Sequence, residues 1–133
     1  MDSWMIAANP KYYDHEKAFR EQSYVDWRQT RNFKVGDTVY IYCAKPISQV
    51  KYKTIVEQTG LEPYVDKYWR IDIDESRIGP KLMKLRLIAA IDSDELRFVN
   101  LKHNGMPYPP QSPCRLKPDL LEYFERFFSG GAI

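Results

Sequence analysis

The stretch Val-Gly-Asp-Thr-Val-Tyr-Ile-Tyr-Cys at residues 35–43 combines a turn signal with a strand pattern. Its Gly-Asp pair is typical of a turn, and the residues after it alternate as a β-strand does. Successive side chains of a strand point to opposite faces, so Tyr40 and Tyr42 are expected on one face. The opposite face then carries Val39, Ile41 and Cys43. The stretch thus predicts a turn leading into a strand with two chemically different faces.

Four other segments have the short apolar or alternating runs that predict strands. They are residues 3–8, 50–58, 68–74 and 82–92, and the last is the longest and is expected to pair centrally in a sheet. Segments rich in polar, Gly or Pro residues separate these strands and are expected to be loops. These loops span residues 24–33, 59–63 and 104–113.

Two helices are predicted, one near each end of the chain. Asp14 is a suitable N-cap for a helix that turns Ala18 and Phe19 inward. Pro118 fits the first position of a closing helix. The apolar stripe of that helix consists of Leu120, Leu121, Phe124, Phe127 and Phe128. Because short loops favour antiparallel hairpins, the expected fold is α+β, a mixed or antiparallel barrel-like sheet flanked by helices.

The size and charge of the chain set broad limits on its function. A chain of 133 residues with 44% hydrophobic residues suits one domain with one core, spanning residues 1–133. The net charge of +2 is weaker than the basic footprint of a typical DNA-binding domain. Charge alone therefore neither indicates nor excludes a nucleic-acid partner.

Nothing in the sequence predicts a membrane span or a secretory signal. The longest strongly apolar stretch, residues 85–91, contains Arg86 and is too short to cross a bilayer. The N-terminus has neither the basic region nor the apolar region of a signal peptide. Cys43 and Cys114 are accordingly expected to be free thiols, and the cytoplasm is the expected compartment.

No residue pattern of a known catalytic or metal site is present. His15 and His103 stand alone, without a neighbouring ligand at metal-type spacing. Nucleotide-binding Gly-rich loops and hydrolase nucleophile motifs are missing as well. The acidic clusters at residues 72–75 and 92–95 fall at predicted strand ends, where acids belong in solvated turns. We therefore expect no catalytic residue, no metal and no cofactor, and a binding protein in place of an enzyme.

The most unusual local feature is Asp-Trp-Arg-Gln-Thr-Arg-Asn at residues 26–32. Trp27 stands in a polar segment without clear periodicity, next to the amides of Gln29 and Asn32 and to two arginines. A flat aromatic wall beside amide donors and acceptors is what recognition of a nucleobase edge requires. The alternative is structural, with Trp27 capping the end of a barrel and the amides satisfying loop backbone groups.

Three segments resemble the EVE domain, a member of the PUA-like superfamily related to the YTH readers of methylated adenine. They are Trp-Met-Ile-Ala-Ala-Asn-Pro at 4–10, Trp-x-x-x-Arg-Asn at 27–32 and the Gly-Asp turn with its aromatic strand at 35–42. The likeness is greatest to EVE-like modules that precede HNH nucleases in modification-dependent restriction proteins. Gln29 stands where the common pattern has Gly, and Cys43 where it has His. Both departures bear on the identity of the ligand.

The resemblance implies a pocket for one extruded base, modified or unmodified, in DNA or RNA. Trp27 and Tyr42 would be stacking walls, and Trp4 and Pro46 would shape the rim. The base edges would be read by Gln29, Asn32 and Asn9. The phosphates would be bound by Arg28, Arg31, Lys51 and Lys53. On this hypothesis Trp27→Ala abolishes ligand binding and leaves the fold intact.

Two other classes of function stay open at this point. A small-molecule sensor would use the same pocket for a free nucleobase or nucleoside. A protein-interaction module would use the Pro-rich segment at residues 107–113. Because the sequence contains no HNH segment, a nuclease, where one is needed, would be a separate partner.

Overall fold

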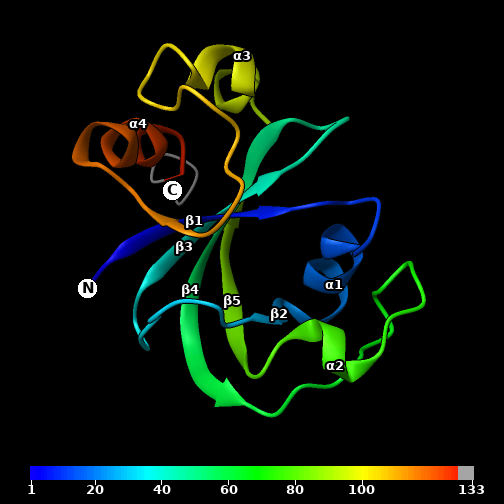
Figure 1. Cartoon of the computed structure of the whole chain (residues 1–133). Helices are drawn as coiled ribbons and strands as arrows, with labels where there is room; N and C mark the ends of the chain where they lie inside the picture. The colour runs from blue at the N-terminus through cyan, green and yellow to red at the C-terminus, as the bar shows by residue number, and fades with distance from the viewer. Residues whose placement is uncertain (129–133) are drawn as a thin grey trace.

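The computed structural model describes residues 1–128 and contains a curved sheet with helices around it (Figure 1). The strands are β1 (Ser3–Ala8), β2 (Tyr24–Arg28), β3 (Thr38–Cys43), β4 (Gln49–Leu61), β5 (Leu82–Ala90) and β6 (Cys114–Arg115). The helices are α1 (His15–Gln22), α2 (Glu75–Ile78), α3 (Phe98–Leu101) and α4 (Pro118–Phe128), with a 3₁₀ turn at Asp94–Leu96. No helix in this part of the chain is long and apolar enough to span a membrane.

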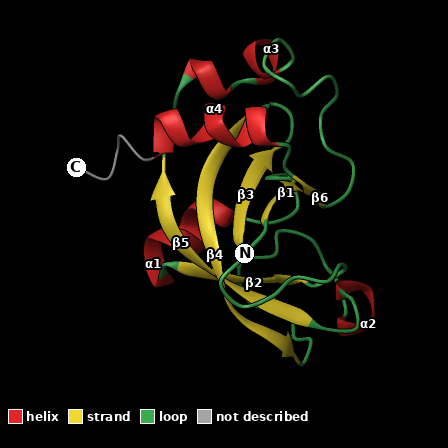
Figure 2. Cartoon of the chain, turned by 90° about the vertical axis from the view of Figure 1, so that its left-hand side faces the viewer, coloured by secondary structure: helices red, strands yellow, loops and turns green. Residues whose placement is uncertain are grey.

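The sheet is mixed, with the strand order β2-β5-β4-β3-β1-β6. β1 pairs with β3 in parallel, and every other neighbouring pair is antiparallel. The expected α+β class and the mixed sheet with flanking helices are confirmed. The sheet curls around its core but does not close, so β2 and β6 stand at its two ends (Figure 2).

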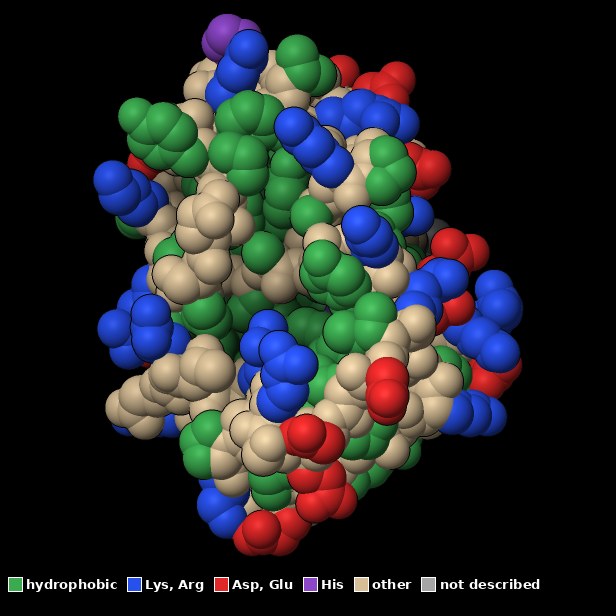
Figure 3. Space-filling view, turned by 45° about the vertical axis from the view of Figure 1, so that its right-hand side comes forward, with side chains coloured by type: hydrophobic (Ala, Val, Ile, Leu, Met, Phe, Trp, Pro, Cys, Tyr) green, Lys and Arg blue, Asp and Glu red, His purple; other side chains and the backbone are tan. Residues whose placement is uncertain are grey.

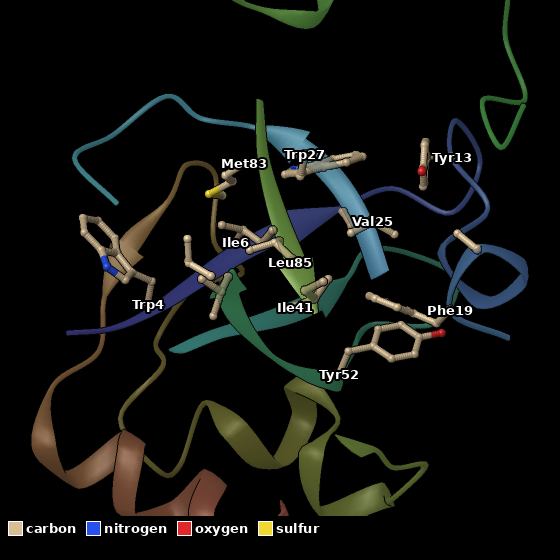
Figure 4. Packing of buried hydrophobic residues seen from close by; sticks show 14 of the residues in the cluster. Trp4, Ile6, Tyr13, Phe19, Val25, Trp27, Ile41, Tyr52, Met83 and Leu85 are labelled. Atoms are coloured by element: carbon tan, nitrogen blue, oxygen red, sulfur yellow. The ribbon is translucent and has the colours of Figure 1, made fainter. Parts of the chain in front are cut away.

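A hydrophobic core lies on each face of the sheet. The first lies inside the curl and runs from Trp4 at one end to Phe19 and Tyr52 at the other (Figure 4). The second lies under α4, where Phe124 and Phe128 pack on the ring of Tyr40. The predicted alternation of β3 is therefore confirmed. Val39, Ile41 and Cys43 belong to the first core, and Tyr40 and Tyr42 belong to the second.

The two predicted helices form where their capping and packing signals place them. The Asp14 carboxylate accepts a hydrogen bond from the Lys17 backbone N–H at 3.1 Å, and Ala18 and Phe19 are buried. In α4 the stripe is only partly buried, because Leu121 and Phe127 lie at its edge. Each fully buried large side chain of this kind contributes roughly 1.5–3 kcal/mol, which holds α4 on the sheet (Figure 2).

Two sequence-based predictions of local structure are wrong. The sequence predicts a loop over residues 24–33, but Tyr24–Arg28 is strand β2, with Val25 and Trp27 buried on one face and Tyr24, Asp26 and Arg28 on the other. Residues 68–74 were expected as a strand, but they form only the isolated bridge of Trp69 with Tyr13. An alternating segment forms a strand only where a partner strand lies beside it. β5 is such a partner for residues 24–28, whereas residues 68–74 have only the bridge to Tyr13.

The boundary of β4 also differs from the prediction. The strand continues through Gly60 to Leu61, into the segment expected as a loop. Register shifts in its pairing with β5 accommodate the positive φ of Gly60, which is 69°. β5 itself is an inner strand, paired on both sides. Cys43 is buried and Cys114 is exposed, and both are free thiols.

Candidate nucleic-acid interface

Two adjoining cavities form one groove, called the groove below, at the C-terminal ends of β1 and β3. The larger encloses about 720 Å³ and the smaller about 230 Å³, and Ala7 and Gln111 line both. Because β1 and β3 are parallel, their ends meet, with Ala7 beside Tyr42. Figure 3 shows a hollow in one face of the molecule that is lined mainly by hydrophobic side chains and bordered by Lys and Arg side chains.

The larger cavity combines aromatic rings with amides. Its lining includes Asn9, Tyr42, Lys45, Ser48, Phe98 and Gln111. Tyr42 is 3% exposed, and burial raises the pKa of its hydroxyl while a hydrogen bond with Ser48 acts in the opposite direction. The Asn9 side-chain oxygen accepts a hydrogen bond from the Lys11 backbone N–H at 2.9 Å, which leaves its NH₂ for a ligand. This cavity therefore places aromatic rings beside amide and hydroxyl groups.

Three separate segments hold this cavity together. The backbone N–H of Phe98 donates to the Ser48 carbonyl at 2.9 Å, which ties the start of α3 to the turn between β3 and β4. The segment at residues 104–117 then crosses back over β1, where Cys114 pairs with Met5 (Figure 1). This pairing carries Gln111 to the end of β1. Pro46 is exposed in the β3–β4 turn and does not line either cavity. It is therefore a residue of the turn and not of the rim, where it was predicted.

The smaller cavity is polar and cationic. Its lining includes Trp27, Arg28, Thr30, Arg31, Gln111 and Ser112. No Asp or Glu is among the described residues that line either cavity. Within residues 1–128, ten lysines and arginines form ion pairs, whereas Arg28, Arg31 and Lys45 form none. The groove therefore presents its cations unneutralised, as an anionic ligand requires.

Trp27 is a wall of the smaller cavity and also part of the first core. Only 6% of the residue is exposed, and its ring stacks on Trp69 at 5.8 Å with an interplanar angle of 10°. Tyr13 contacts it edge-on at 5.1 Å, and His15 lies at 4.8 Å. Because these rings cover it, Trp27 offers little free face to a base. The structure thus combines the two interpretations of this residue, a core position and a cavity wall.

Trp4 lies in the core, away from the predicted rim. It is 3% exposed, packs on Phe33 at 4.4 Å and donates its indole N–H to Oδ2 of Asp37 at 3.0 Å. Its polar atom is therefore already satisfied within the protein. The prediction failed because Trp4 lies on the face of β1 that points into the first core, together with Ile6 and Ala8.

Gln29 and Asn32 also lie apart from the cavity lining. The side-chain oxygen of Gln29 accepts a hydrogen bond from the Gly60 backbone N–H at 2.8 Å, which joins the end of β2 to β4. Asn32 is exposed in the loop after β2. Gln29 therefore has the structural role that was the alternative to base recognition, because its amide bonds a backbone group.

The two lysines of β4 point elsewhere. Lys53 forms an ion pair with Glu125 of α4 at 2.9 Å, and its side chain is only 19% exposed. Lys51 lines a different cavity, with Phe19 and Tyr52 beside α1. Of the predicted site residues, the groove thus brings together Trp27, Arg28, Arg31, Asn9 and Tyr42.

Several lining residues were missed by sequence reasoning, above all Phe98 and Gln111. Phe98 lies in a short helix and Gln111 in a Pro-rich surface loop, and neither segment has a sequence pattern typical of a binding site. The prolines beside Gln111 signal an ordered loop, but no local pattern reveals that this loop returns to β1. Lys45 and Ser48 were within reach, because they flank the predicted Tyr42 strand.

Comparison with known proteins supports the architecture. No protein-family model matches the sequence, and no curated protein matches it significantly. Among solved structures, ASCH from Zymomonas mobilis superimposes with a TM-score of 0.64 at 14% identity, covering 95% of each chain. The fold is PUA-like.

Two further solved structures superimpose on the chain to a similar extent. A hypothetical protein from Leishmania major has a TM-score of 0.65 at 16% identity, covering 100% of this chain and 98% of its own. Rpa0253 from Rhodopseudomonas palustris has a TM-score of 0.67 at 9% identity, covering 97% and 94%. At such identities the likeness establishes the fold alone, and it does not single out the EVE domain.

Proposed function

We propose that this PUA-like domain binds nucleic acid by taking one nucleobase, modified or unmodified, into the larger cavity of the groove, and that it does so without catalysis. The observation that carries the proposal is that two unlike cavities adjoin through shared lining residues. A space lined by aromatic rings and amides lies next to one lined by two arginines that form no ion pair with a described residue, and Ala7 and Gln111 line both. A base with its phosphate has the same two chemistries side by side.

The energetics are consistent with a base that is already unstacked or is extruded on binding. Stacking on aromatic side chains contributes about 1–3 kcal/mol per base, and extruding a base from a duplex costs a few kcal/mol. Phe98 supplies the accessible aromatic surface and the buried Tyr42 lies behind it in the cavity wall, while Asn9 and Gln111 supply edge contacts. Single strands, loops and damaged or modified positions are therefore the preferred targets.

The resemblance to EVE-like modules adds two finer hypotheses. A modification on the base would be read by the amides of the larger cavity. A separate nuclease would act on the bound strand. Of the motifs that carry this resemblance, those at residues 4–10 and 35–42 include Trp4 and Asp37. These two side chains bond to each other and stabilise the fold, so they do not contact the ligand.

The proposal is tested by titrating the protein with short DNA and RNA oligonucleotides, plain or methylated at cytosine or adenine, at two salt concentrations. Intrinsic Trp fluorescence reports binding, because Trp27 borders the groove. Gln111→Ala should weaken binding by roughly fivefold, as expected for one lost hydrogen bond. Gln58→Ala, an exposed glutamine of β4, is the matched control and should leave affinity unchanged.

Other results would assign a different function. Weak, salt-independent binding of free nucleosides would indicate a small-molecule sensor. No response to any oligonucleotide or nucleoside would overturn the proposal and favour a protein partner. Cleavage of a labelled oligonucleotide by the purified protein, abolished by Gln111→Ala, would contradict the non-catalytic part.

A further inference from the structure

We propose that the smaller cavity is a subsite for a phosphomonoester, so that the preferred ligand is a nucleotide or strand that ends in the groove with a terminal phosphate. This inference rests on the proposed function, since the base of the same nucleotide would lie in the larger cavity. The inference goes further by predicting that the domain binds the end of a nucleic-acid strand in preference to its interior.

Charge is the first argument for a terminal phosphate. Arg28 and Arg31 line the smaller cavity, make no ion pair with a described residue and have no carboxylate beside them in the described lining. A phosphomonoester carries about −1.5 to −2 charges at pH 7, whereas an internal phosphodiester carries one. Two unpaired guanidinium groups match the charge of the monoester.

Hydrogen bonding is the second argument. The hydroxyl-bearing residues Thr30 and Ser112 and the amide of Gln111 line the cavity with the two arginines. Guanidinium groups bind phosphate oxygens in a bidentate manner, and hydroxyls complete the shell of a group with three terminal oxygens. A diester has only two such oxygens and would leave donors unmatched.

The backbone holds these donors in place. Arg28 is the last residue of β2, and its guanidinium lies 5.8 Å from the centre of the Trp27 ring. The chain then leaves the sheet with the Gln29 backbone N–H bonded to the Lys81 carbonyl at 3.0 Å. Arg31 follows at once and lines the same cavity. Both arginines are thus set by the end of a strand that Trp27 anchors.

Shape is the third argument. The smaller cavity, at about 230 Å³, adjoins the larger through Ala7 and Gln111. A terminal phosphate enters such a space with one substituent, the sugar that leads back to the base. An internal phosphate carries a second sugar, which would have to leave past the exposed side chains of Arg28, Thr30 and Arg31.

The experiment compares oligonucleotides of one sequence that end in 5′-hydroxyl, 5′-phosphate or 3′-phosphate, alongside a nucleoside, its monophosphate and inorganic phosphate. One phosphorylated strand should bind roughly tenfold or more tightly than its hydroxyl form. Arg31→Gln should remove most of that difference, because it weakens binding of the phosphorylated form far more than binding of the hydroxyl form. Arg126→Gln, on α4, is the control and should keep the difference. Thermal melts check that each variant is folded.

The outcomes separate this inference from the proposed function. Equal binding of all three strand forms would overturn the terminal-phosphate subsite and leave the nucleic-acid proposal standing. Tight binding of the nucleoside monophosphate with no gain from the strand would assign the site to free nucleotides, and preference for a phosphorylated strand would assign it to strand ends. Binding of none of these ligands would overturn both proposals.

Discussion

The indole N–H of Trp4 donates a hydrogen bond to Oδ2 of Asp37 over 3.0 Å, inside the protein and 33 residues apart in sequence. The same carboxylate accepts the backbone N–H groups of Lys34 and Asp2, each at 3.0 Å. Burial alone would raise the pKa of Asp37, but these donors hold it below its usual value. The Gly-Asp turn is therefore a clamp that joins the start of β1 to the start of β3. Those two strands carry the groove at their other ends.

Loss of this clamp should destabilise the whole domain. Asp37→Ala leaves the buried indole N–H and two backbone N–H groups without their acceptor, and we expect a loss of about 3 kcal/mol in the free energy of unfolding. Urea denaturation measures it. A double-mutant cycle with Trp4→Phe should show coupling, because each change removes the same bond. Strict additivity would contradict the clamp.

Acid should weaken the fold through His15. This histidine is buried among aromatic rings, and burial lowers its pKa to about 4, against the opposing effects of a hydrogen bond to the Tyr13 backbone and the charge of Asp14. Since an unfolded histidine titrates near pH 6.5, the unfolded state binds more protons between these values. Stability is therefore full above about pH 6.5 and falls as the pH drops toward 4.

The size of this effect is measurable by denaturation at two pH values. Between pH 7 and pH 5 the wild-type protein should lose about 2 kcal/mol through this group. His15→Leu should remove that part of the pH dependence. His103→Gln, at an exposed position, should behave as wild type. An unchanged pH dependence in His15→Leu would show that another group is responsible.

Trp27→Ala should strongly destabilise the fold. A loss of ligand binding in this variant would therefore not show that Trp27 contacts the ligand. The substitution removes a ring that contacts Trp69, Tyr13 and His15, and large aromatic-to-alanine changes in a core cost roughly 3–5 kcal/mol. We expect a markedly lower melting temperature, measured by circular dichroism. Gln111→Ala, at an exposed position of the same cavity, should melt as wild type. A fully stable Trp27→Ala protein would show that the ring is not a core element.

Lysines 45 and 53 should have opposite roles. Lys45→Gln removes an unpaired cation from the groove and should lower the slope of log Kd against log salt by about 0.7 for a single strand. Lys53→Gln breaks the ion pair with Glu125 and should leave that slope unchanged while lowering stability modestly. Salt titrations of oligonucleotide binding check both. A reduced slope for Lys53→Gln would show that Lys53 contacts phosphate, as the sequence analysis predicted.

Much of the fold follows from local patterns, and the failures have definite causes. The turn at residues 35–37 and the alternation of β3 were predictable because strand periodicity and turn chemistry are local. β2 was missed because its two buried residues, Val25 and Trp27, alternate within a polar segment. Residues 68–74 alternate equally well, but within residues 1–128 their only β-pairing is the isolated bridge of Trp69 with Tyr13.

The α+β class, the two faces of β3 and the N-cap of α1 were predictable from the sequence, because each depends on neighbours within a few residues. Only the tertiary structure decided which residues share the groove. The parallel pairing of β1 with β3 places Ala7 beside Tyr42, and the return of the chain at Cys114 brings Gln111 to them. The ion pair of Lys53 with Glu125 likewise joins residues 72 positions apart. Such contacts depend on how elements pack across the sheet, and no periodicity of a single segment encodes that packing.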